Sequence, residues 1–385
     1  MKHTVWHIYL DYNSFTPIDP RVLESFLLFL QDNFANPRST HHFGKRINEK
    51  VKQAREQIAN FSNAEPKELF FSSGVTEPII ISIKELAVSF SIKGKHIITV
   101  STEYKTILDT CKDLERKGFE VAYLPVQSND LIDIGELKKF ILTDTILVSV
   151  IFVNNETGDI QAIKEIANLV HEKGALFITD ANQAVGIMEI DVDDLGIDLL
   201  CFSGHKMYAP KGIGALFVRQ RENKVKLALQ IHGVDHEQGT RSGTLNVPGI
   251  IALAKACEII SEEMALNQKN ISALRDKLET ELLKLPNASL NGDSDDRVYN
   301  TTNTCLKGQD AYILIGRMKD IAVSNNSACF SAVVEPSHVL TSMGLSDDDT
   351  FASLKFSLGK FNTLEYVETV INRIKELAQP NLNYA

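Results

Sequence analysis

Residues 199–218 read LLCFSGHKMYAPKGIGALFV, and this stretch indicates the class of fold. It begins with the apolar run Leu199–Ser203, which predicts a buried strand, and it ends with a second strand-like run, Gly212–Val218. The polar residues Ser203, His205 and Lys206 stand where the first of these strands ends. Because ligands bind at the carboxyl ends of the strands in an open α/β sheet, this junction is a candidate functional site.

Similar strand-like runs lie upstream and alternate with segments of helical periodicity, such as Ile163–Lys173. This alternation is typical of βα units, so we predict an α/β fold with a mostly parallel central sheet flanked by helices. The strands predicted upstream are Glu68–Ser72, His96–Val100, Val121–Pro125, Ile146–Val153 and Leu176–Asp180.

Two helices are predicted before the first of these strands. Asp19 as N-cap and Pro20 at the first helical position begin one helix, and the other follows Gly44. The apolar positions expected to face the core are Val22, Leu23, Phe26, Leu27 and Leu30 in the first helix and Ile47, Val51, Ala54, Ile58 and Phe61 in the second.

The pattern changes after about residue 262. A long charged helix is predicted over Ile271–Leu285, and a break at Pro286 and Asn287 follows it. Shorter strand and helix segments then lead to a last predicted helix, Thr363–Ala378. Since 385 residues also exceed the usual length of one domain, we expect a smaller C-terminal domain.

The composition excludes several classes of function. The chain has 40 Lys+Arg and 50 Asp+Glu, a net charge of −10, and it has no basic run that could follow a phosphate backbone. Direct nucleic-acid binding is therefore not expected. The sequence shows no signal peptide, and the longest apolar stretch, Ile146–Val153, is too short to span a bilayer. We expect a cytoplasmic protein without a membrane partner.

Neither a disulfide framework nor a metal site is expected. The five cysteines are odd in number and widely spaced, and the histidines show no metal-ligand spacing with carboxylate partners. The cysteines expected to be unreactive, because each lies in an apolar or helical stretch, are Cys111, Cys201, Cys257 and Cys305.

A carboxylate and a lysine stand at the ends of two successive predicted strands, as Asp180 and Lys206. This pair suits a pyridine aldehyde cofactor, because the lysine forms a Schiff base and the carboxylate keeps the pyridine nitrogen protonated. A lysine taken alone is more often a solvated surface residue, but the neighbouring Ser203 and His205 favour the cofactor interpretation. The turn at residues 72–77 is able to hold a phosphate at a helix N-terminus, although simple helix capping also explains it.

The segment Phe202–Leu216 resembles the cofactor-lysine motif of the NifS/IscS-type cysteine desulfurases, which belong to the class V aminotransferase group. The likeness extends over nearly the whole chain. The other matching segments are Tyr9–Tyr12, Asn36–Ser39 with His41, Gly74–Glu77, Asn154–Gly158, Gly239–Val247, Ser327–Cys329, Glu335–Leu340 and Ser357–Gly359.

This resemblance implies the fold-type I architecture of pyridoxal-phosphate enzymes and a homodimer. It divides the chain into a large cofactor-binding domain, residues 15–262, and a small α+β domain made of residues 1–14 and 263–385. The small domain would carry the segment with the catalytic cysteine.

The resemblance also implies a set of residues around pyridoxal 5'-phosphate. Thr244 would reach the phosphate bound by the partner subunit, and His41 would line the substrate site. The remaining cofactor residues implied are Lys206 for the Schiff base, Asp180 for the pyridinium nitrogen, Gln183 for the phenolic oxygen, Val75, Thr76, Ser203 and His205 on the phosphate side, and Asn155 near the ring oxygen and the substrate.

Cys329 indicates the reaction. Its flanks, Ser324–Ser331, are small and polar, which suits a reactive thiolate. By resemblance, Lys206 removes the α-proton of L-cysteine, and Cys329 attacks the substrate sulfur, which leaves L-alanine and a persulfide on Cys329. An acceptor protein would then take the sulfur for iron–sulfur assembly, tRNA thiolation or DNA phosphorothioation.

Several positions depart from the family pattern, and two of them, Tyr104 and Lys355, bear directly on the chemistry. Tyr104 stands where a ring-stacking histidine with a proton-transfer role is usual, and its high reference pKa makes it a poorer proton shuttle at neutral pH. Lys355 stands where an arginine normally binds the substrate carboxylate, so two-pronged hydrogen bonding is lost. Two alternatives therefore remain open: another class V enzyme, such as a selenocysteine lyase or a β-lyase, and a weakly active or non-catalytic desulfurase-like subunit.

Overall fold

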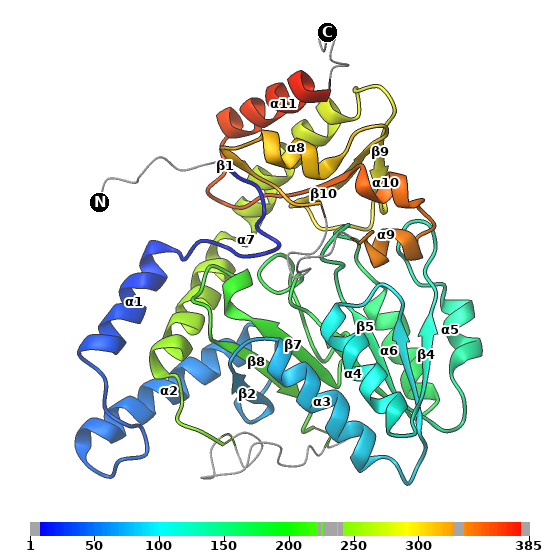
Figure 1. The fold of residues 1–385 in the computed structure, drawn as a ribbon. Coiled ribbons are helices and arrows are strands. Elements are labelled where there is room, and N and C mark those ends of the chain that lie inside the picture. The colour runs from blue at the N-terminus through cyan, green and yellow to red at the C-terminus, as the bar shows by residue number, and fades with distance from the viewer. Residues whose placement is uncertain (1–7, 222–224, 226–236, 238–241, 326–334, 379–385) are drawn as a thin grey trace.

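The computed structural model describes residues 8–221, 225, 237, 242–325 and 335–378. These residues form two lobes, one above the other in Figure 1. The lower lobe contains a seven-stranded sheet with helices on both faces. The upper lobe contains a three-stranded sheet with α8 (Ala311–Arg317) and α11 (Leu364–Ala378).

The seven-stranded sheet has the order β2-β8-β7-β6-β5-β3-β4. Five neighbouring strands, from β7 to β4, are parallel, and β8 is antiparallel to both β7 and β2. The predicted α/β fold with a mostly parallel sheet is therefore confirmed, with strand ends within two residues of the predicted ones. The strands are β2 (Leu69–Ser72), β3 (His96–Val100), β4 (Glu120–Leu124), β5 (Thr145–Ile151), β6 (Leu176–Asp180), β7 (Leu199–Ser203) and β8 (Gly214–Val218).

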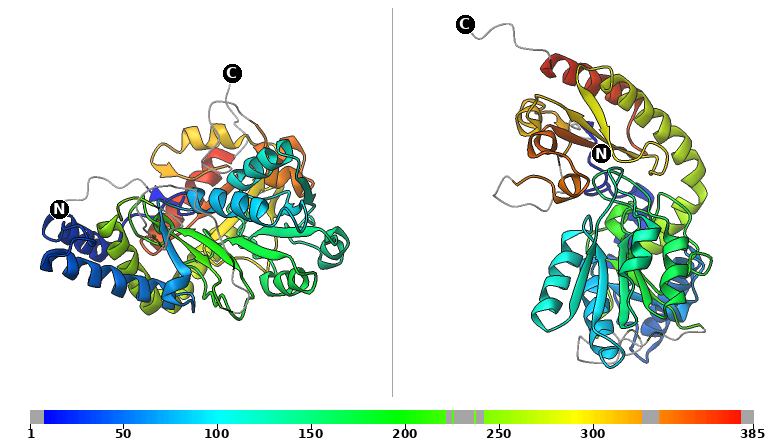
Figure 2. Two further views of the ribbon diagram at one scale, coloured as in Figure 1. Left: turned by 90° about the horizontal axis from the view of Figure 1, so that it is seen from below. Right: turned by 90° about the vertical axis from the view of Figure 1, so that its right-hand side faces the viewer.

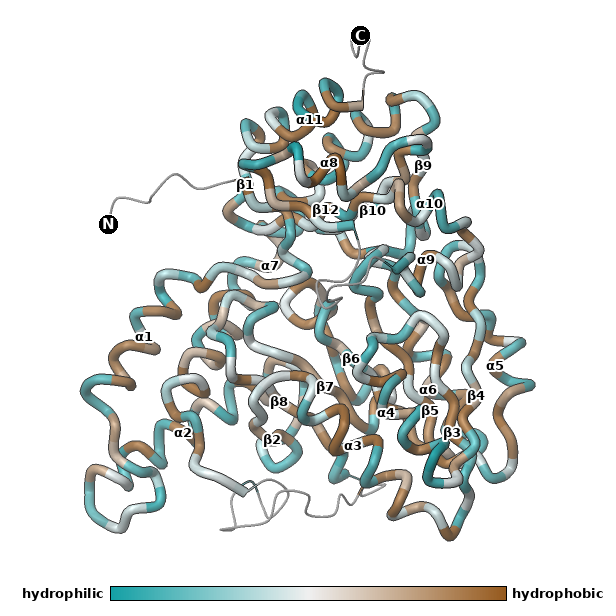
Figure 3. The backbone as a smooth tube through the Cα atoms, in the orientation of Figure 1, coloured by the Kyte–Doolittle hydropathy of each residue, from teal (hydrophilic) through white to brown (hydrophobic). Residues whose placement is uncertain are grey.

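Both faces of this sheet are covered, which explains why its central strands are buried and mostly apolar. Alternate residues of β7 enter different cores: Leu199 and Cys201 pack with α3 and α4, and Leu200 and Phe202 pack with helices of the other face. Figure 3 shows hydrophobic residues concentrated along the strands. The helices of the two faces are α3 (Thr76–Ser89) and α4 (Lys105–Arg116) on one, and α2 (His42–Asn60), α5 (Ile134–Phe140), α6 (Ile163–Glu172) and α7 (Val247–Leu282) on the other.

The upper lobe combines antiparallel strands with helices. Strand β10 (Thr301–Leu306) lies between β9 (Ala288–Asn291) and β12 (Ser353–Ser357), and both pairings are antiparallel. The N-terminal strand β1 (Ile8–Tyr9) pairs with β11 (Ile321–Ala322), so the first described residues of the chain join this lobe. Two short helices, α9 (His338–Ser342) and α10 (Asp347–Phe351), also belong to the C-terminal part.

Helix α7 connects the lobes and runs along one side of the molecule, as the right-hand view of Figure 2 shows. Ile250 and Leu253 pack in the lower lobe, whereas Leu278 and Leu282 pack in the upper one. The expected start of a helix at Ile271 is wrong, because the helix is continuous from Val247. The expected domain boundary at residue 262 lies inside α7, where the packing partners change, and the division into two domains stays a prediction.

Helix α1 (Pro20–Gln31) begins after the N-cap Asp19, as predicted, but its buried face is only partly the expected one. Its sequence contains two apolar stripes at helical spacing, and only the stripe containing Val22 and Phe29 is buried. Leu30, on the other stripe, is 53% exposed. The reason is that α1 packs on one side only, against α7.

Helix α2 begins at His42, before Gly44, and buries Ile47, Val51, Ala54 and Ile58 as predicted. None of the helices in the described part of the chain is long and apolar enough to cross a membrane.

Candidate active site

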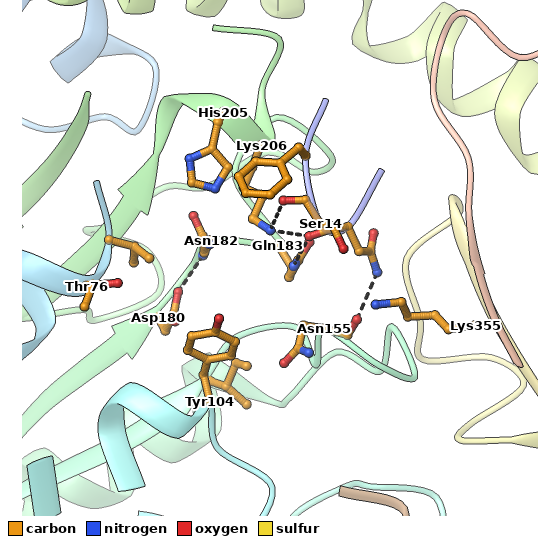
Figure 4. A pocket seen from close by; sticks show the side chains of 14 residues that line it. Ser14, Thr76, Tyr104, Asn155, Asp180, Asn182, Gln183, His205, Lys206 and Lys355 are labelled. Carbon is orange, nitrogen blue, oxygen red and sulfur yellow. Dashed lines mark hydrogen bonds between the residues drawn. The ribbon is translucent and has the colours of Figure 1, made fainter. Parts of the chain in front are cut away.

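A cavity of about 250 Å³ opens at the carboxyl ends of β6 and β7, between the two lobes (Figure 4). Most of the residues proposed from the sequence line it. These are Val75, Thr76, Tyr104, Asn155, Asp180, Gln183, His205, Lys206 and Lys355.

Lys206 lies in a short turn of 3₁₀ helix, Gly204–Lys206, directly after β7. Its ammonium group donates hydrogen bonds to the backbone carbonyl oxygens of Asn13 and Ser14, the second at 2.8 Å. Both acceptors belong to the segment that links β1 to α1, so the N-terminal part of the chain forms one wall of the cavity. The lysine points into the cavity from the edge of the large sheet (Figure 4).

Asp180 is the last residue of β6 and is buried at the bottom of the same cavity. Its Oδ1 accepts a hydrogen bond from the backbone N–H of Asn182 at 2.8 Å. Burial raises the pKa of Asp180 to about 6, although the Asn182 hydrogen bond and the charge of Lys206 oppose this shift. A buried carboxylate of this kind is suited to a cationic partner such as a protonated ring nitrogen.

The N-terminus of α3 forms another side of the cavity, with Val75 and Thr76. The backbone N–H of Val75 donates to Ser203 Oγ at 2.7 Å, so this serine holds the turn, and it does not itself line the cavity. Burial and the nearby charges of Lys206 and Lys211 lower the pKa of His205 to about 4. His205 is therefore neutral at pH 7 and able to donate or accept a hydrogen bond.

Tyr104 is the N-cap of α4, and its ring faces the cavity next to Asp180 (Figure 4). The preceding residue, Glu103, is fully buried, and burial together with the charge of Asp180 raises its pKa well above the usual range. Burial therefore disfavours a second negative charge beside Asp180.

Lys355 comes from the middle of β12, in the upper lobe, and is 1% exposed. Its ammonium lies 3.8 Å from Asp11 Oδ1, which also accepts a hydrogen bond from Ser324 Oγ at 3.1 Å. Figure 4 shows the lysine pointing across the cavity toward Asn155. A cation at this position is able to bind a substrate carboxylate.

Two further proposed residues, His41 and Thr244, lie away from this cavity. His41 is exposed and caps α2, where its Nδ1 accepts from the Gly44 N–H at 3.2 Å. Thr244 is exposed and precedes α7. Neither lines this cavity of its own chain. Cys329 lies outside the described residues.

The structure adds five lining residues that were not predicted: Asn13, Ser14, Phe15, Ile151 and Asn182. Asn182 and Ile151 lie next to predicted residues at strand ends, and that position was an available signal for them. The segment 13–15 follows a strand of only two residues and carries no pattern of its own.

The remaining cysteines behave as expected. Cys111, Cys201, Cys257 and Cys305 are buried and unpaired, and burial raises the pKa of each thiol, that of Cys111 to about 12. Their thiols are therefore protonated at neutral pH and poor nucleophiles. Among the described residues, no cluster of three metal-ligating side chains occurs.

The profile of the family "Aminotransferase class-V" matches residues 8–370. The chain belongs to the class V aminotransferase family. The cofactor of this family member is pyridoxal phosphate.

Among its relatives in this family, cysteine desulfurase IscS from Pectobacterium carotovorum is 45% identical over 372 residues, which cover 96% of this chain and 92% of the relative. IscS from Methylococcus capsulatus is 44% identical over 370 residues, with the same coverage.

Three solved structures are also similar to the structure of this chain. A NifS-like protein has a TM-score of 0.90 at 34% identity, covering 96% of this chain and 99% of its own. SspA in complex with cysteine has a TM-score of 0.81 at 35% identity, covering 92% and 100%. DndA from Streptomyces lividans has a TM-score of 0.79 at 35% identity, covering 89% and 98%. These similarities confirm the fold expected from the sequence.

The side chains that line the cavity are chemically suited to pyridoxal phosphate. Lys206 and Asp180, the two groups that the cofactor requires, share it. The hydroxyl of Ser14 is buried at its edge without a hydrogen-bond partner in the described chain, so a polar group is available for a ligand.

Proposed function

We propose that this chain is a cysteine desulfurase that converts L-cysteine to L-alanine and carries the sulfur as a persulfide on Cys329. The observation that supports this best is the convergence of Lys206, Asp180 and Lys355 on one cavity in a member of this family. The first two suit the cofactor, and the third suits the carboxylate of an amino acid.

Pyridoxal phosphate supplies an electron sink that stabilises negative charge at the substrate α-carbon. Asp180 would hold a proton at the ring nitrogen, and Gln183 would donate to the ring oxygen. Thr76 and His205 would contact the phosphate. Each of these groups is on a strand end or helix start of the large sheet, so the chain presents them in a fixed arrangement.

The chain's own residues then handle the substrate. Lys355 binds the α-carboxylate, and Lys206 Nζ removes the α-proton. The thiolate of Cys329 attacks the substrate sulfur: a sulfur–sulfur bond forms as the bond from sulfur to the β-carbon breaks, and the electron pair of that bond returns to the substrate carbon skeleton. Protonation of that skeleton gives alanine, so L-cysteine and the Cys329 thiol become L-alanine and a Cys329 persulfide.

We also propose that the protein is a homodimer. Helix α1 and the chain after it expose Leu28, Leu30, Phe34 and Phe43, with Phe34 82% exposed. The hydrophobic residues of α1 are visible at the left edge of the molecule in Figure 3. A second copy of the chain covering this surface explains the apolar exposure. The exposed Thr244 would then be available to the partner's cavity, as the resemblance implies.

Sedimentation measures this association. Wild type should sediment as a dimer, and Phe34→Glu should dissociate it or weaken it. A fully active wild-type monomer would contradict the homodimer. The sulfur-acceptor protein, the choice among its pathways and the cytoplasmic location stay predictions.

The activity is tested by quantifying alanine and sulfide after L-cysteine and a thiol reductant, which releases the persulfide sulfur as sulfide, are added to the purified, cofactor-loaded protein. Wild type should form both, whereas Cys329→Ser should bind the cofactor and L-cysteine but form neither. Cys305→Ser is the matched control, since this thiol lies outside the cavity. Product formation that persists in Cys329→Ser would instead support a lyase. A wild type whose absorbance does not respond to any amino acid would support a non-catalytic subunit.

A further inference from the structure

Asn13 lies where the N-terminal segment of the chain passes between the upper and the lower lobe. It is 5% exposed, and it follows Tyr12 in the segment that passes from the upper lobe to α1. Every polar atom of this residue has a hydrogen-bond partner, and the partners come from both lobes. Nothing in the desulfurase chemistry above assigns this residue a role.

On one side Asn13 is tied to the upper lobe. Its backbone N–H donates to Ser357 Oγ in β12 at 2.9 Å. Its side chain pairs with Thr301 in β10: Nδ2 lies 3.0 Å from Thr301 Oγ1, and Oδ1 lies 3.2 Å from the same oxygen. Asn300 Nδ2 also donates to Oδ1, at 3.4 Å. Thr301 is fully buried and does not line the cavity.

On the other side Asn13 contacts three residues of the lower lobe that line the cavity. Its Nδ2 donates to the Asn155 carbonyl oxygen at 3.2 Å. Its own carbonyl oxygen accepts from Gln183 Nε2 at 3.0 Å and from the Lys206 ammonium. One carbonyl therefore sets the direction of both the lysine and the glutamine.

We propose that Asn13 is a positioning residue, which uses its anchorage to Thr301 in the upper lobe to orient Lys206, Gln183 and Asn155 at the cofactor. This inference rests on the proposed function, since it assumes that Lys206 holds pyridoxal phosphate. The Asn13 carbonyl is the resting place of the Lys206 amine when it is not bound to the cofactor. Without the side-chain anchor, the carbonyl moves and the lysine and glutamine move with it.

The physical basis of this proposal is the loss of reaction rate when a reacting group is misplaced. A shift of about 1 Å in a reacting group lowers a rate by up to about 10²-fold. The anchor consists of buried side-chain hydrogen bonds, so its removal also leaves polar atoms of Asn300 and Asn155 without their partner. Replacement of Asn13 itself therefore risks a folding defect, and the sharper test is made at Thr301.

The test compares Thr301→Val with wild type. Valine has nearly the same shape as threonine but offers no hydroxyl to either atom of the Asn13 amide. We expect kcat for alanine formation to fall about tenfold or more. The KM for L-cysteine should change less than about twofold, because the Lys355–Asp11 pair is untouched. The absorbance maximum of the bound cofactor should also shift, because the Gln183 contact to the ring oxygen changes. Thr301→Ser, which keeps the hydroxyl, should restore both readouts.

Asn291→Ala is the matched control. Asn291 is also 5% exposed in the upper lobe and makes two side-chain hydrogen bonds at 2.9 Å, to Asn303 and Ser353, but it has no contact with the cavity. This variant should lower the melting temperature while kcat and the spectrum stay as in wild type. If Thr301→Val does the same, the positioning role is overturned and only a structural role is left.

A double variant completes the test. If Thr301 acts through Asn13, the kcat of Asn13→Ala should be unchanged by adding Thr301→Val; multiplied losses would contradict the inference. Different results contradict the proposed function and the positioning role of Asn13. A wild type that forms no lysine-bound cofactor overturns the proposed function, whereas an intact wild type with an unaffected Thr301→Val overturns only the inference.

Discussion

Lys206 and Lys355 face the same cavity, but they come from contrasting regions of the molecule. Lys206 follows β7 at the carboxyl edge of a parallel sheet, where chain direction brings several polar groups together without disturbing the core. Lys355 is an interior residue of an antiparallel strand and is almost completely buried. Its charge therefore needs the compensating carboxylate of Asp11.

The two regions therefore constrain their side chains differently. At a strand end, backbone geometry holds the groups around Lys206 in place, so the chemistry of the site is the main constraint on each side chain. Within β12, Lys355 must satisfy packing and charge pairing and, in the proposed mechanism, substrate binding as well. We therefore expect substitutions on the Lys206 side to abolish the chemistry and substitutions on the Lys355 side to change substrate binding.

The largest effect is expected for Lys206→Ala. It removes both the covalent attachment of the cofactor and the base, so alanine formation should fall by at least about 10³-fold. The visible absorbance of the lysine-bound cofactor should disappear as well, which is checked spectroscopically. Lys211→Ala is the control, because Lys211 is an exposed neighbour and should leave the spectrum unchanged. Retention of the wild-type spectrum by Lys206→Ala would refute the assignment.

Asp180→Asn should lower kcat by about 10²–10³-fold, since the amide cannot balance a protonated ring nitrogen. The same change should stabilise the cofactor-free protein at neutral pH. Because the pKa of folded Asp180 is raised from 3.8 to about 6, its protonated form favours folding, and that contribution is lost as the pH rises through 6. The difference corresponds to about 3 kcal/mol above pH 6.

Thermal unfolding of the two cofactor-free proteins checks the sign of this effect. Asp180→Asn should melt at a higher temperature than wild type at pH 7.5, and the advantage should vanish near pH 4. An advantage that grows toward acidic pH would show that the pKa of Asp180 is lowered instead.

Lys355→Met should have a smaller effect, mainly on substrate binding. Loss of a charged hydrogen bond of about 1.5–3 kcal/mol predicts a rise in the KM for L-cysteine of about 10- to 100-fold. The cofactor spectrum should stay unchanged, and steady-state kinetics with spectra check both expectations. Lys360→Met is the matched control: the side chain of Lys360 is also only 8% exposed, but it pairs with Asp19 and Glu263 outside the cavity. Equal KM values for the two variants would remove Lys355 from substrate binding.

The smallest effect is expected for Tyr104→His. An imidazole titrates near neutral pH, whereas a phenol does not, so kcat should rise by about two- to tenfold if this position relays a proton. The pH–rate profile should then gain a limb near pH 6–7, and Tyr104→Phe should match wild type. A loss of activity in Tyr104→Phe would show that the tyrosine hydroxyl takes part in the reaction.

The two sides of the cavity also differ in how well the sequence predicted them. Asp180, Gln183, His205 and Lys206 were found because each lies within a few residues of a strand whose apolar pattern is strong. Asn13 was missed because its role depends on Thr301, which is 288 residues away in the chain. Local patterns carry no information on such a contact.

The helices also show that local sequence patterns do not predict contacts between distant segments. Two apolar stripes on α1 satisfy the same periodicity, and only the position of α7 decides that Val22 and Phe29 are buried while Leu30 is exposed. The start of α7 was placed too late because its two halves pack against different cores and therefore differ in composition.

By itself, the sequence determined the α/β class, the strands of the large sheet and most of the predicted residues that line the cavity, because backbone periodicity and short motifs act over a few residues. Only the tertiary structure decided which surface of α1 is buried, how Lys355 is paired with Asp11, and how Asn13 connects the lobes. These features depend on contacts between distant segments, and the free energy of such contacts is set by packing, burial and charge pairing in the folded chain.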